Sequence, residues 1–497
     1  MPEPRQGGFR RLRRRADSDT AGQPPTRASV RNAKIVSLPV AYAARRAGGV
    51  GRRALGRPAH EVELDIQART AQHMFEVLGE LKGCAAKLGQ LLALYELALP
   101  AELGAPYREA LSHLQDSAPA MLPGAVRAAM AENLGPEWES HFTRFDARAC
   151  AAASVGQVHR AVWHDGRAVA VKLMYPGARE SVRSDLEQIR RLAPLATVFA
   201  PAADTRALAA ALADCINEEL DYVTEAATQR SFATAYADDP DFVVPEVVHQ
   251  QGDVLVSEWL DGIPLPRIIE SGAQQEKDRI GLLITRFVLS SGVRTGRLYT
   301  DPHPGNFRVL RDGRLGVVDF GACPTFPADF PALVGEIADA AFNGTDAQLL
   351  AVLRRHEFVR SDRDFDIAAL RIVTTEVREL FYHRVVRLTT PWLRRQVLRA
   401  TDLRLSNVCR ELTSAPQYTP IGRAIVATAG VLCQLDVEGP LRAELLTYIP
   451  ELAAPLERFL LGEELPPVTR HLVAVTDASS SATPSTTVPS VPCTSKW

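Results

Sequence analysis

The sequence predicts an α+β fold of two lobes, a small sheet lobe and a larger helical lobe, behind a helical N-terminal extension. Three observations lead to this prediction. Apolar residues recur mostly at three- and four-residue steps within residues 62–134, without a convincing strand. Short strands separated by turn sequences follow between residues 145 and 257. Helical patterns return from residue 263, interrupted by one predicted hairpin at 307–318.

The 497 residues divide into five segments by composition and pattern. We expect the two terminal segments to be disordered, because they hold few large apolar residues. The segments are a basic arm (1–58), the helical extension (59–140), the sheet lobe with a hinge (141–262), the helical lobe (263–465) and a Ser/Thr/Pro-rich tail (466–497).

The overall charge is close to neutral, but its distribution is uneven. A net charge of −2 gives no sign of nucleic-acid binding. The first sixty residues nevertheless hold fourteen Lys and Arg against three acids. This arm is either a solvated basic segment or one attracted to anionic lipid head groups, an attraction worth about 1 kcal/mol per basic residue near a membrane.

Seven scattered cysteines form no Cys-x-x-Cys pair, so the sequence predicts neither a zinc site nor a disulfide framework. That usage suits a reducing compartment. No apolar stretch has the length of a signal peptide core or of a transmembrane helix. We therefore expect a cytoplasmic location, with any membrane contact being peripheral.

The extension contains three predicted helices, at 62–99, 106–115 and 123–134. Within the first, Lys87 and Gln90 flank a glycine, which costs a helix interior about 0.5–1 kcal/mol relative to alanine. The glycine indicates close backbone packing or a contact made by the lysine and the glutamine. The alternative is an ordinary solvated helix edge.

The first predicted hairpin joins residues 155–163 to 168–174 through a His-Asp-Gly-Arg turn. In its second strand, Lys172 shares a face with alanines, while Val171 and its apolar neighbours lie on the other face. Such a lysine either lies on an open sheet face or is buried and needs a partner. The functional alternative is the strand lysine that contacts the α- and β-phosphates of ATP.

An alanine-rich segment precedes this hairpin, where a phosphate-binding loop would be expected. It consists of Ala151, Ala152, Ala153 and Ser154, followed by Val-Gly. Backbone N–H groups there could approach phosphate, but alanine strongly disfavours positive φ. We therefore expect a loop that is stiffer than a glycine-rich one.

Residues 204–235 are predicted to form a long helix with an acidic second half. Acids on a helix are usually solvated. Glu219 and Glu225, however, lie on or beside the apolar stripe, where a buried carboxylate needs a cation. Lys172 is the candidate partner of Glu225.

A second hairpin is predicted from residues 242–248 and 253–257, with Pro245 placing its first strand at a sheet edge. The segment from Glu258 through Leu260 follows it. This segment reads as a hinge whose backbone groups could bind an adenine edge, or as a plain turn between lobes.

Two acids and one amide lie on turns after the predicted helix 277–290. Asn306 follows Asp301 by five positions, and Asp319, in Asp-Phe-Gly, follows Asn306 by thirteen. The hairpin between them brings the two loops together. This spacing suits phosphoryl transfer, with Asp301 orienting or deprotonating the acceptor and the other two residues holding Mg²⁺. An ordinary turn is the alternative. From 328 to about 461 the chain reads as mostly helical, without a second such set.

Taken in order, these motifs resemble the UbiB-type atypical kinases, the aarF-domain family associated with coenzyme Q. The resemblance covers roughly residues 60–460. It implies a protein-kinase-like fold with the helical extension packed over the active site. The segments that carry it are Lys87–Gln90, Ala151–His159, Val169–Lys172, Glu219–Tyr222, Asp301–Asn306 and Asp319–Gly321.

The resemblance assigns roles to five residues of the central site. It implies that Lys172 contacts the nucleotide phosphates and pairs with Glu225. Asp301 matches the catalytic-loop acid, and Asn306 and Asp319 match the Mg²⁺ ligands. In the family, Tyr-Thr before the catalytic acid is often His-Ala, so the resemblance assigns no histidine role here.

Four further residues and one loop match features that set this family apart. Lys87 and Gln90 match the signature of the extension, which lies where a protein substrate would bind. Glu219 and Asp221 match acids that meet the extension. The segment Ala151–Ser154 matches an alanine loop that alters nucleotide preference and disfavours protein phosphorylation.

The sequence thus predicts a Mg²⁺-dependent atypical kinase or ATPase that binds ATP or ADP. The resemblance implies a role in the biosynthesis or distribution of an isoprenoid quinone or related lipid. The expected partners are the nucleotide and an isoprenoid lipid or anionic membrane surface. One alternative is a phosphotransferase of the aminoglycoside or choline kinase type, which shares the Asp-x-x-x-x-Asn loop. Another is a nucleotide-gated scaffold without turnover.

Overall fold

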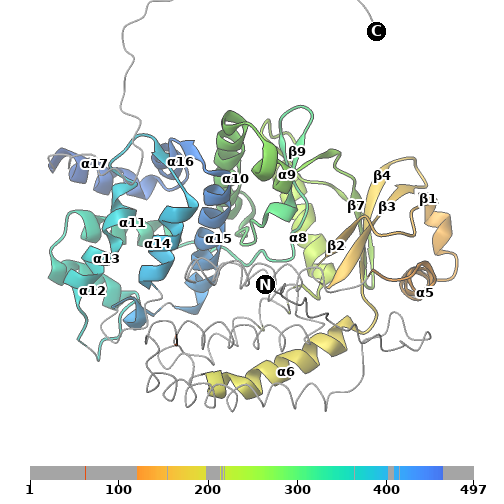
Figure 1. Ribbon diagram of the computed structural model, residues 1–497, viewed down its shortest axis with the longest axis horizontal. Helices are drawn as coiled ribbons and strands as arrows, with labels where there is room; N and C mark the ends of the chain where they lie inside the picture. Colours follow the sequence, from red (N-terminus) through yellow and green to blue (C-terminus); the bar gives the residue numbers. More distant parts are fainter. Residues whose placement is uncertain are drawn as a thin grey trace, which may run out of the picture.

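The computed structural model consists of a sheet lobe and a larger helical lobe, with helix α8 between them (Figure 1). This arrangement confirms the predicted α+β, two-lobe fold. The residues that the structure describes are Val62, 120–153, 155–196, 213, 217, 219–362, 364–400, 408–413 and 415–462.

The sheet lobe is built on an antiparallel sheet of order β1-β3-β4-β7-β6, with β2 also paired to β3. The strand from Ala168 to Met174 has the bounds predicted from its alternating pattern. The strands are β1 (Phe142–Phe145), β2 (Ala151–Ala153), β3 (Gly156–Trp163), β4 (Ala168–Met174), β6 (Val247–Gln251) and β7 (Val254–Glu258).

Helices cover both faces of this sheet. Helix α5 (Pro123–Leu134) packs Val126 and Met130 onto the face that carries Val171. Helices α6 (Ala178–Ala196) and α8 (Tyr222–Ala235) pack on the opposite face. Burying each large apolar side chain contributes about 1.5–3 kcal/mol, so both faces hold the lobe together. Lys172 therefore lies on the face that α8 covers.

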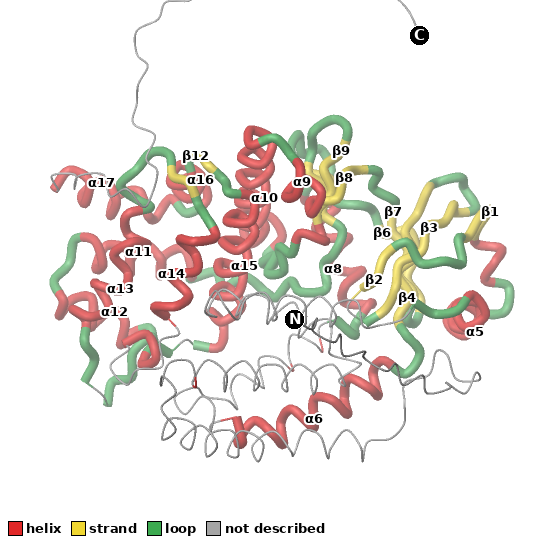
Figure 2. The backbone as a smooth tube through the Cα atoms, in the orientation of Figure 1, coloured by secondary structure: helices red, strands yellow, loops and turns green. Residues whose placement is uncertain are grey.

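The larger lobe starts with a small sheet of order β5-β10-β9-β8 and continues as helices (Figure 2). Its strands are β5 (Phe242–Val243), β8 (Gly262–Pro264), β9 (Phe307–Leu310) and β10 (Leu315–Val317). A further strand pair joins β11 (Val386–Arg387) to β12 (Glu438–Gly439). The helices are α9 (Leu265–Ser271), α10 (Gln274–Thr295), α11 (Phe330–Phe342), α12 (Asp346–Arg355), α13 (Ile367–Glu379), α14 (Thr390–Ala400), α15 (Thr419–Leu435), α16 (Leu441–Tyr448) and α17 (Ala453–Gly462).

An aromatic cluster fastens α8 to the larger lobe. The Phe232 ring of α8 lies 4.9 Å from that of Phe320, and the Phe287 ring of α10 lies 5.2 Å from that of Tyr299. All four side chains are buried. Tyr299 adjoins the predicted Asp301 loop, and Phe320 lies in the predicted Asp319 loop. Packing of this cluster therefore fixes the position of both loops relative to α8.

Two predicted elements were wrong in their extents. The predicted helix 204–235 does not run unbroken, because Asp221 caps the start of α8 and residues 219–220 form a turn. The predicted strand 242–248 divides into β5, which joins the other sheet, and β6. Pro245 lies between the two, where its missing N–H breaks the ladder.

Several predictions concern residues outside the described part of the chain. They are the disordered arm and tail, the helices at 62–99 and 106–115 apart from Val62, the roles of Lys87 and Gln90, the placement of Ser154, and most of the first half of the predicted helix 204–235.

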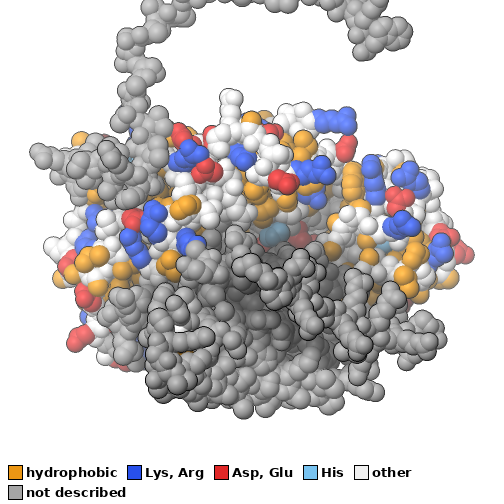
Figure 3. Space-filling model, viewed as in Figure 1, with side chains coloured by type: hydrophobic (Ala, Val, Ile, Leu, Met, Phe, Trp, Pro, Cys, Tyr) orange, Lys and Arg blue, Asp and Glu red, His pale blue; other side chains and the backbone are white. Residues whose placement is uncertain are grey.

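Among the described helices, none is sufficiently long and apolar to cross a membrane. On the face shown in Figure 3, Lys and Arg side chains alternate with Asp and Glu over the described surface. No large area of a single charge is visible there.

Buried polar groups connect the strand after the alanine-rich segment to the start of α5. The Gln157 side chain accepts a hydrogen bond from the Met121 backbone N–H at 2.9 Å and lies 2.8 Å from His159 Nε2. His159 Nδ1 lies 2.9 Å from the Asp146 carbonyl oxygen. A neutral imidazole protonated on Nδ1 satisfies both contacts. Gln157 and His159 therefore have a structural role.

We expect acidification below about pH 6.5 to destabilise the wild type more than a His159→Gln variant. Burial lowers the pKa of His159, so the unfolded chain takes up this proton first as pH falls. The contribution to stability is thus present above the unfolded pKa and is lost on acidification toward the folded value. Urea unfolding at several pH values measures it, and equal pH dependence in both proteins would contradict the assignment.

Candidate active site

A buried ion pair joins the sheet lobe to α8. Lys172 Nζ on β4 lies 2.7 Å and 2.9 Å from the two carboxylate oxygens of Glu225. The two side chains are only 13% and 2% exposed. A buried lysine and a buried glutamate each need a partner of opposite charge, and each provides it for the other. The structure thus brings together the pair predicted from the sequence.

The same lysine also reaches the Asp-Phe-Gly segment of the larger lobe. Lys172 Nζ lies 3.5 Å from Asp319 Oδ2, although the two residues are 147 positions apart. Asp319 Oδ1 accepts a hydrogen bond from the Gly321 backbone N–H at 3.1 Å. This bond fixes the orientation of the carboxylate, so one lysine contacts acids from both lobes.

The electrostatics of this cluster keep the lysine charged. Burial alone would lower the pKa of Lys172, but Asp319 and Glu225 outweigh it and hold the pKa well above its usual range. Burial raises the pKa of Glu225 to about 7, with the Lys172 ammonium opposing that rise. The site therefore presents a cation beside two carboxylates that compete for it.

The predicted catalytic loop is held by hydrogen bonds to its own backbone. The Asn306 side-chain amide donates to the Asp301 carbonyl oxygen at 3.0 Å, and the His303 N–H donates to the same oxygen at 2.7 Å. Because the amide nitrogen of Asn306 is used in this way, its oxygen is the atom that could bind a metal.

The β9–β10 hairpin brings the Asn306 loop to the Asp319 loop. Its two strands pair in antiparallel register, and the Val318 N–H donates to the Asn306 carbonyl oxygen at 3.0 Å. Buried Tyr299 lies beneath both loops. Burial raises its pKa well above the usual range, and the nearby charges of Asp301 and Asp319 add to that rise. The loops that carry the two acids and the amide therefore lie next to each other.

Thr300, at the position where the family often has alanine, has a structural role. Its N–H and its hydroxyl both donate to the Ala322 carbonyl oxygen, at 3.2 Å and 2.9 Å. Arg423 of α15 donates to the same hydroxyl at 2.7 Å. These contacts fasten the catalytic loop to the segment after Asp319. The sequence carried no sign of Arg423, which lies 123 residues away.

The predicted hinge connects β7 to β8. The N–H groups of Glu258 and Trp259 complete the sheet by donating to the carbonyl oxygens of Glu246 and Ala168. Leu260 lies against Gly316 of β10, where an added Cβ would come within 2.7 Å of its side chain. The hinge is thus close to the strand that leads into Asp319. Its contact with adenine stays a prediction.

The alanine-rich segment is a short strand. Ala151, Ala152 and Ala153 pair with β3, and the first two side chains are exposed. The register Ala153 to Gly156 makes the connection tight, and Ser154 lies outside the described residues. The segment borders the strand that pairs with β4. Its contact with phosphate stays a prediction.

Glu219 and Asp221, the two acids predicted to contact the extension, have different surroundings in the structure. Glu219 is buried and contributes to the raised pKa of Lys172. Asp221 is exposed and caps α8, accepting hydrogen bonds from the N–H groups of Val223 and Thr224 at 3.1 Å and 3.0 Å. Replacing such a cap typically costs about 1 kcal/mol. No contact with the extension is needed to explain Asp221.

The residues present fit a magnesium ion shared with a nucleotide. The described part of the chain holds no group of three His, Cys, Asp or Glu suited to a metal alone. Mg²⁺, however, usually takes one or two protein oxygens and completes its shell with phosphates and water. The Asn306 amide oxygen and the Asp319 carboxylate would supply two such oxygens.

The fold is protein-kinase-like in three respects. It has a small antiparallel sheet, a lysine–glutamate pair that joins this sheet to a helix, and a helical lobe that carries the Asp301 and Asp319 loops. A model of the ABC1 atypical kinase-like domain matches residues 113–353. The chain belongs to this family of atypical kinases, which confirms the resemblance seen in its motifs.

Three similar proteins illustrate the relationship. The mitochondrial atypical kinase COQ8 of Saccharomyces cerevisiae is 31% identical over 57% of this chain and 58% of its own length. The chloroplastic ACTIVITY OF BC1 COMPLEX KINASE 3 of Arabidopsis thaliana is 32% identical over 50% of this chain and 36% of its own. The solved Rv3197–erythromycin complex from Mycobacterium tuberculosis matches with a TM-score of 0.59 and 36% identity, over 80% of this chain and all of that one.

The chain spans about half the length of the curated relatives it matches, and identity to them is near 30%. The kinase-like fold therefore extends to this chain, together with membership of the family. The similarity does not identify the reaction, the phosphate acceptor or the partners of this chain.

Proposed function

We propose that the chain binds Mg²⁺ with ATP or ADP between its two lobes and acts as an atypical kinase or ATPase. The observation that carries this proposal is Lys172, which contacts Glu225 and Asp319 at once. A cation placed between the sheet lobe and the Asp-Phe-Gly segment is the arrangement that phosphoryl transfer requires.

Each polar residue of the site has one task in this proposal. Lys172 neutralises charge on the nucleotide phosphates, and Glu225 keeps the lysine in place. Asn306 and Asp319 would hold Mg²⁺, which neutralises charge on the transferred phosphoryl group. Asp301 orients or deprotonates the acceptor, a hydroxyl group or water. Electrostatic stabilisation of this kind is usually the largest contribution to such catalysis.

The biological role proposed is support of the biosynthesis or distribution of an isoprenoid quinone or related lipid. It follows from family membership and from the basic composition of residues 1–58, which would attract the chain to an anionic membrane surface. The proposed location is the cytoplasm, at or near such a surface.

ATP hydrolysis by the full chain tests this proposal. We expect turnover with Mg²⁺ and none with excess EDTA, and faster turnover with phosphatidylserine-containing liposomes than with neutral ones. Nucleotide binding without hydrolysis under every condition would favour the scaffold alternative. Hydrolysis that is indifferent to Mg²⁺ would contradict the site assignment.

A second ligand class comes from the solved relative, which is described in complex with erythromycin. Incubating the chain with ATP and erythromycin, choline or an aminoglycoside tests for transfer to a soluble alcohol. A phosphorylated product would favour the small-molecule phosphotransferase.

A further inference from the structure

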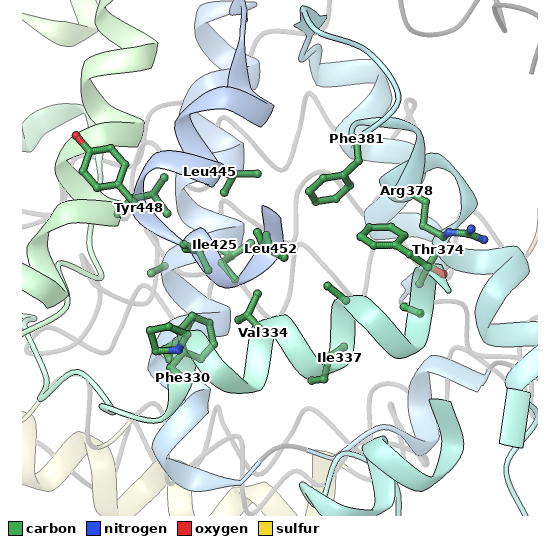
Figure 4. A pocket seen from close by; sticks show the side chains of 18 of the residues that line it. Phe330, Val334, Ile337, Thr374, Arg378, Phe381, Ile425, Leu445, Tyr448 and Leu452 are labelled. Carbon is green, nitrogen blue, oxygen red and sulfur yellow. The ribbon is translucent and has the colours of Figure 1, made fainter. Parts of the chain in front are cut away.

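An apolar cavity of about 430 Å³ lies in the helical lobe, and none of the proposed nucleotide-site residues lines it. Figure 4 shows side chains from α11, α15 and α16 directed toward one space, including Val334, Ile425 and Leu445. Helices α10, α12 and α13 complete the wall. Protein interiors rarely contain voids much larger than a water molecule, so a space of this size is an exception to close packing.

The wall offers few polar partners to an occupant, the exception being Arg378, whose buried Nε has no hydrogen-bond partner among the described residues. Among the lining residues that the structure describes, Arg371 and Thr374 already donate hydrogen bonds, to the Asp346 carboxylate and to backbone carbonyls. The Arg378 guanidinium lies over two phenylalanine rings, 5.4 Å and 6.0 Å from their centres. Tyr448 directs its hydroxyl away from the space (Figure 4). Water inside would have few partners, and apolar cavities of this kind stay dry.

Two lining residues show that the cavity reaches the surface. Val293 of α10 is 70% exposed and Ile425 of α15 is 59% exposed, and both line the cavity. A closed core would hide such side chains. Their exposure provides an apolar entrance, and an occupant that fills the cavity would cover them and gain from their burial.

The volume of the cavity and its apolar lining narrow the class of occupant. The cavity falls within the range of about 300–1,000 Å³ that small-molecule sites occupy. Because its wall is apolar and its entrance is apolar, an elongated hydrocarbon can pass inward without losing hydrogen bonds. A compact polar metabolite would lose its own hydration and recover little of it.

We propose that this cavity binds the hydrocarbon tail of a single lipid, entering between Val293 and Ile425. The inference rests on the proposed function in one respect, since it names the place where the lipid served by the nucleotide site would be held. The tail could be of isoprenoid or acyl origin, and both share the chemistry that the wall recognises.

Equilibrium binding of radiolabelled farnesol and palmitate to the full chain tests the proposal. We expect saturable binding with one site per chain. Val334→Trp places an indole ring in part of the cavity and is expected to lower affinity by about tenfold, because the ligand loses buried methylene groups. Ile372→Trp is the matched control, since Ile372 is an exposed residue of α13 that does not line the cavity.

A second variant tests the proposal even if Val334→Trp fails to fold. Ile425→Gln changes only the exposed entrance, so the fold should persist while affinity falls. Preference for farnesol would indicate an isoprenoid source and preference for palmitate an acyl source. Saturable binding of neither probe, or binding that Val334→Trp and Ile425→Gln leave unchanged, would overturn the proposal. Mg-ATP binding and hydrolysis are measured on the same proteins, so failure of the nucleotide site would be recognised separately.

Discussion

Replacing Asp319 with asparagine is expected to abolish Mg²⁺-dependent nucleotide binding, with a loss of affinity above about 100-fold. Asparagine keeps the shape of the side chain and can still accept the hydrogen bond from the Gly321 N–H. It removes the negative charge that a hard divalent cation requires. Calorimetric titration with Mg-ATP measures this loss.

The matched control is Asp312→Asn in the turn of the β9–β10 hairpin. The Asp312 carboxylate is exposed and pairs with the Arg314 of the same turn. Its replacement should leave nucleotide affinity unchanged and thus exclude a general effect of charge. Undiminished Mg-ATP affinity in Asp319→Asn would remove the basis of the metal assignment.

The features most accurately predicted from the sequence are those set by short-range patterns. Alternation of apolar and small residues placed β4 at its observed bounds and put Lys172 opposite the Val171 face. The turn between residues 310 and 315 predicted the hairpin that joins Asn306 to Asp319. The need of a buried lysine for a partner then indicated Glu225.

Features that depend on contacts between distant segments escaped prediction. The apolar periodicity predicted a helix that continued past Asp221. A single sequence does not distinguish a capping aspartate from an aspartate on a helix surface. The Arg423–Thr300 hydrogen bond joins residues whose proximity follows only from helix packing. The apolar cavity of the helical lobe likewise arises from several helices, each of which shows an ordinary apolar stripe.

The motif segment Ala151–His159 combines a predicted phosphate-binding role with a structural role, and the sequence alone does not distinguish the two. Ala151 and its neighbours lie at the predicted phosphate loop. Gln157 instead holds the Met121 backbone just before α5, and His159 contacts the Asp146 carbonyl oxygen just after β1. Residues of a motif shared within a family can therefore serve packing as well as catalysis or binding. Substitution of the two buried polar residues should change stability before it changes nucleotide contact.

Asp301→Asn should lower ATP turnover by about 10²–10⁴-fold while changing nucleotide affinity little. In the proposed site, phosphate and metal contacts belong to Lys172, Asn306 and Asp319, so the nucleotide still binds. The asparagine amide cannot take a proton from the acceptor. The carbonyl of residue 301, which holds the Asn306 side chain, is unchanged by the substitution, so the loop keeps its shape.

Measuring the turnover number and the Mg-ATP dissociation constant on the same preparation separates two roles of Asp301. A fall in turnover at constant affinity identifies the residue as base or positioning acid for the acceptor. A matched loss of affinity would instead assign Asp301 to the metal shell beside Asp319. Unchanged turnover would mean that hydrolysis in the wild type does not need the Asp301 carboxylate, and the acceptor would then have to be oriented by another side chain.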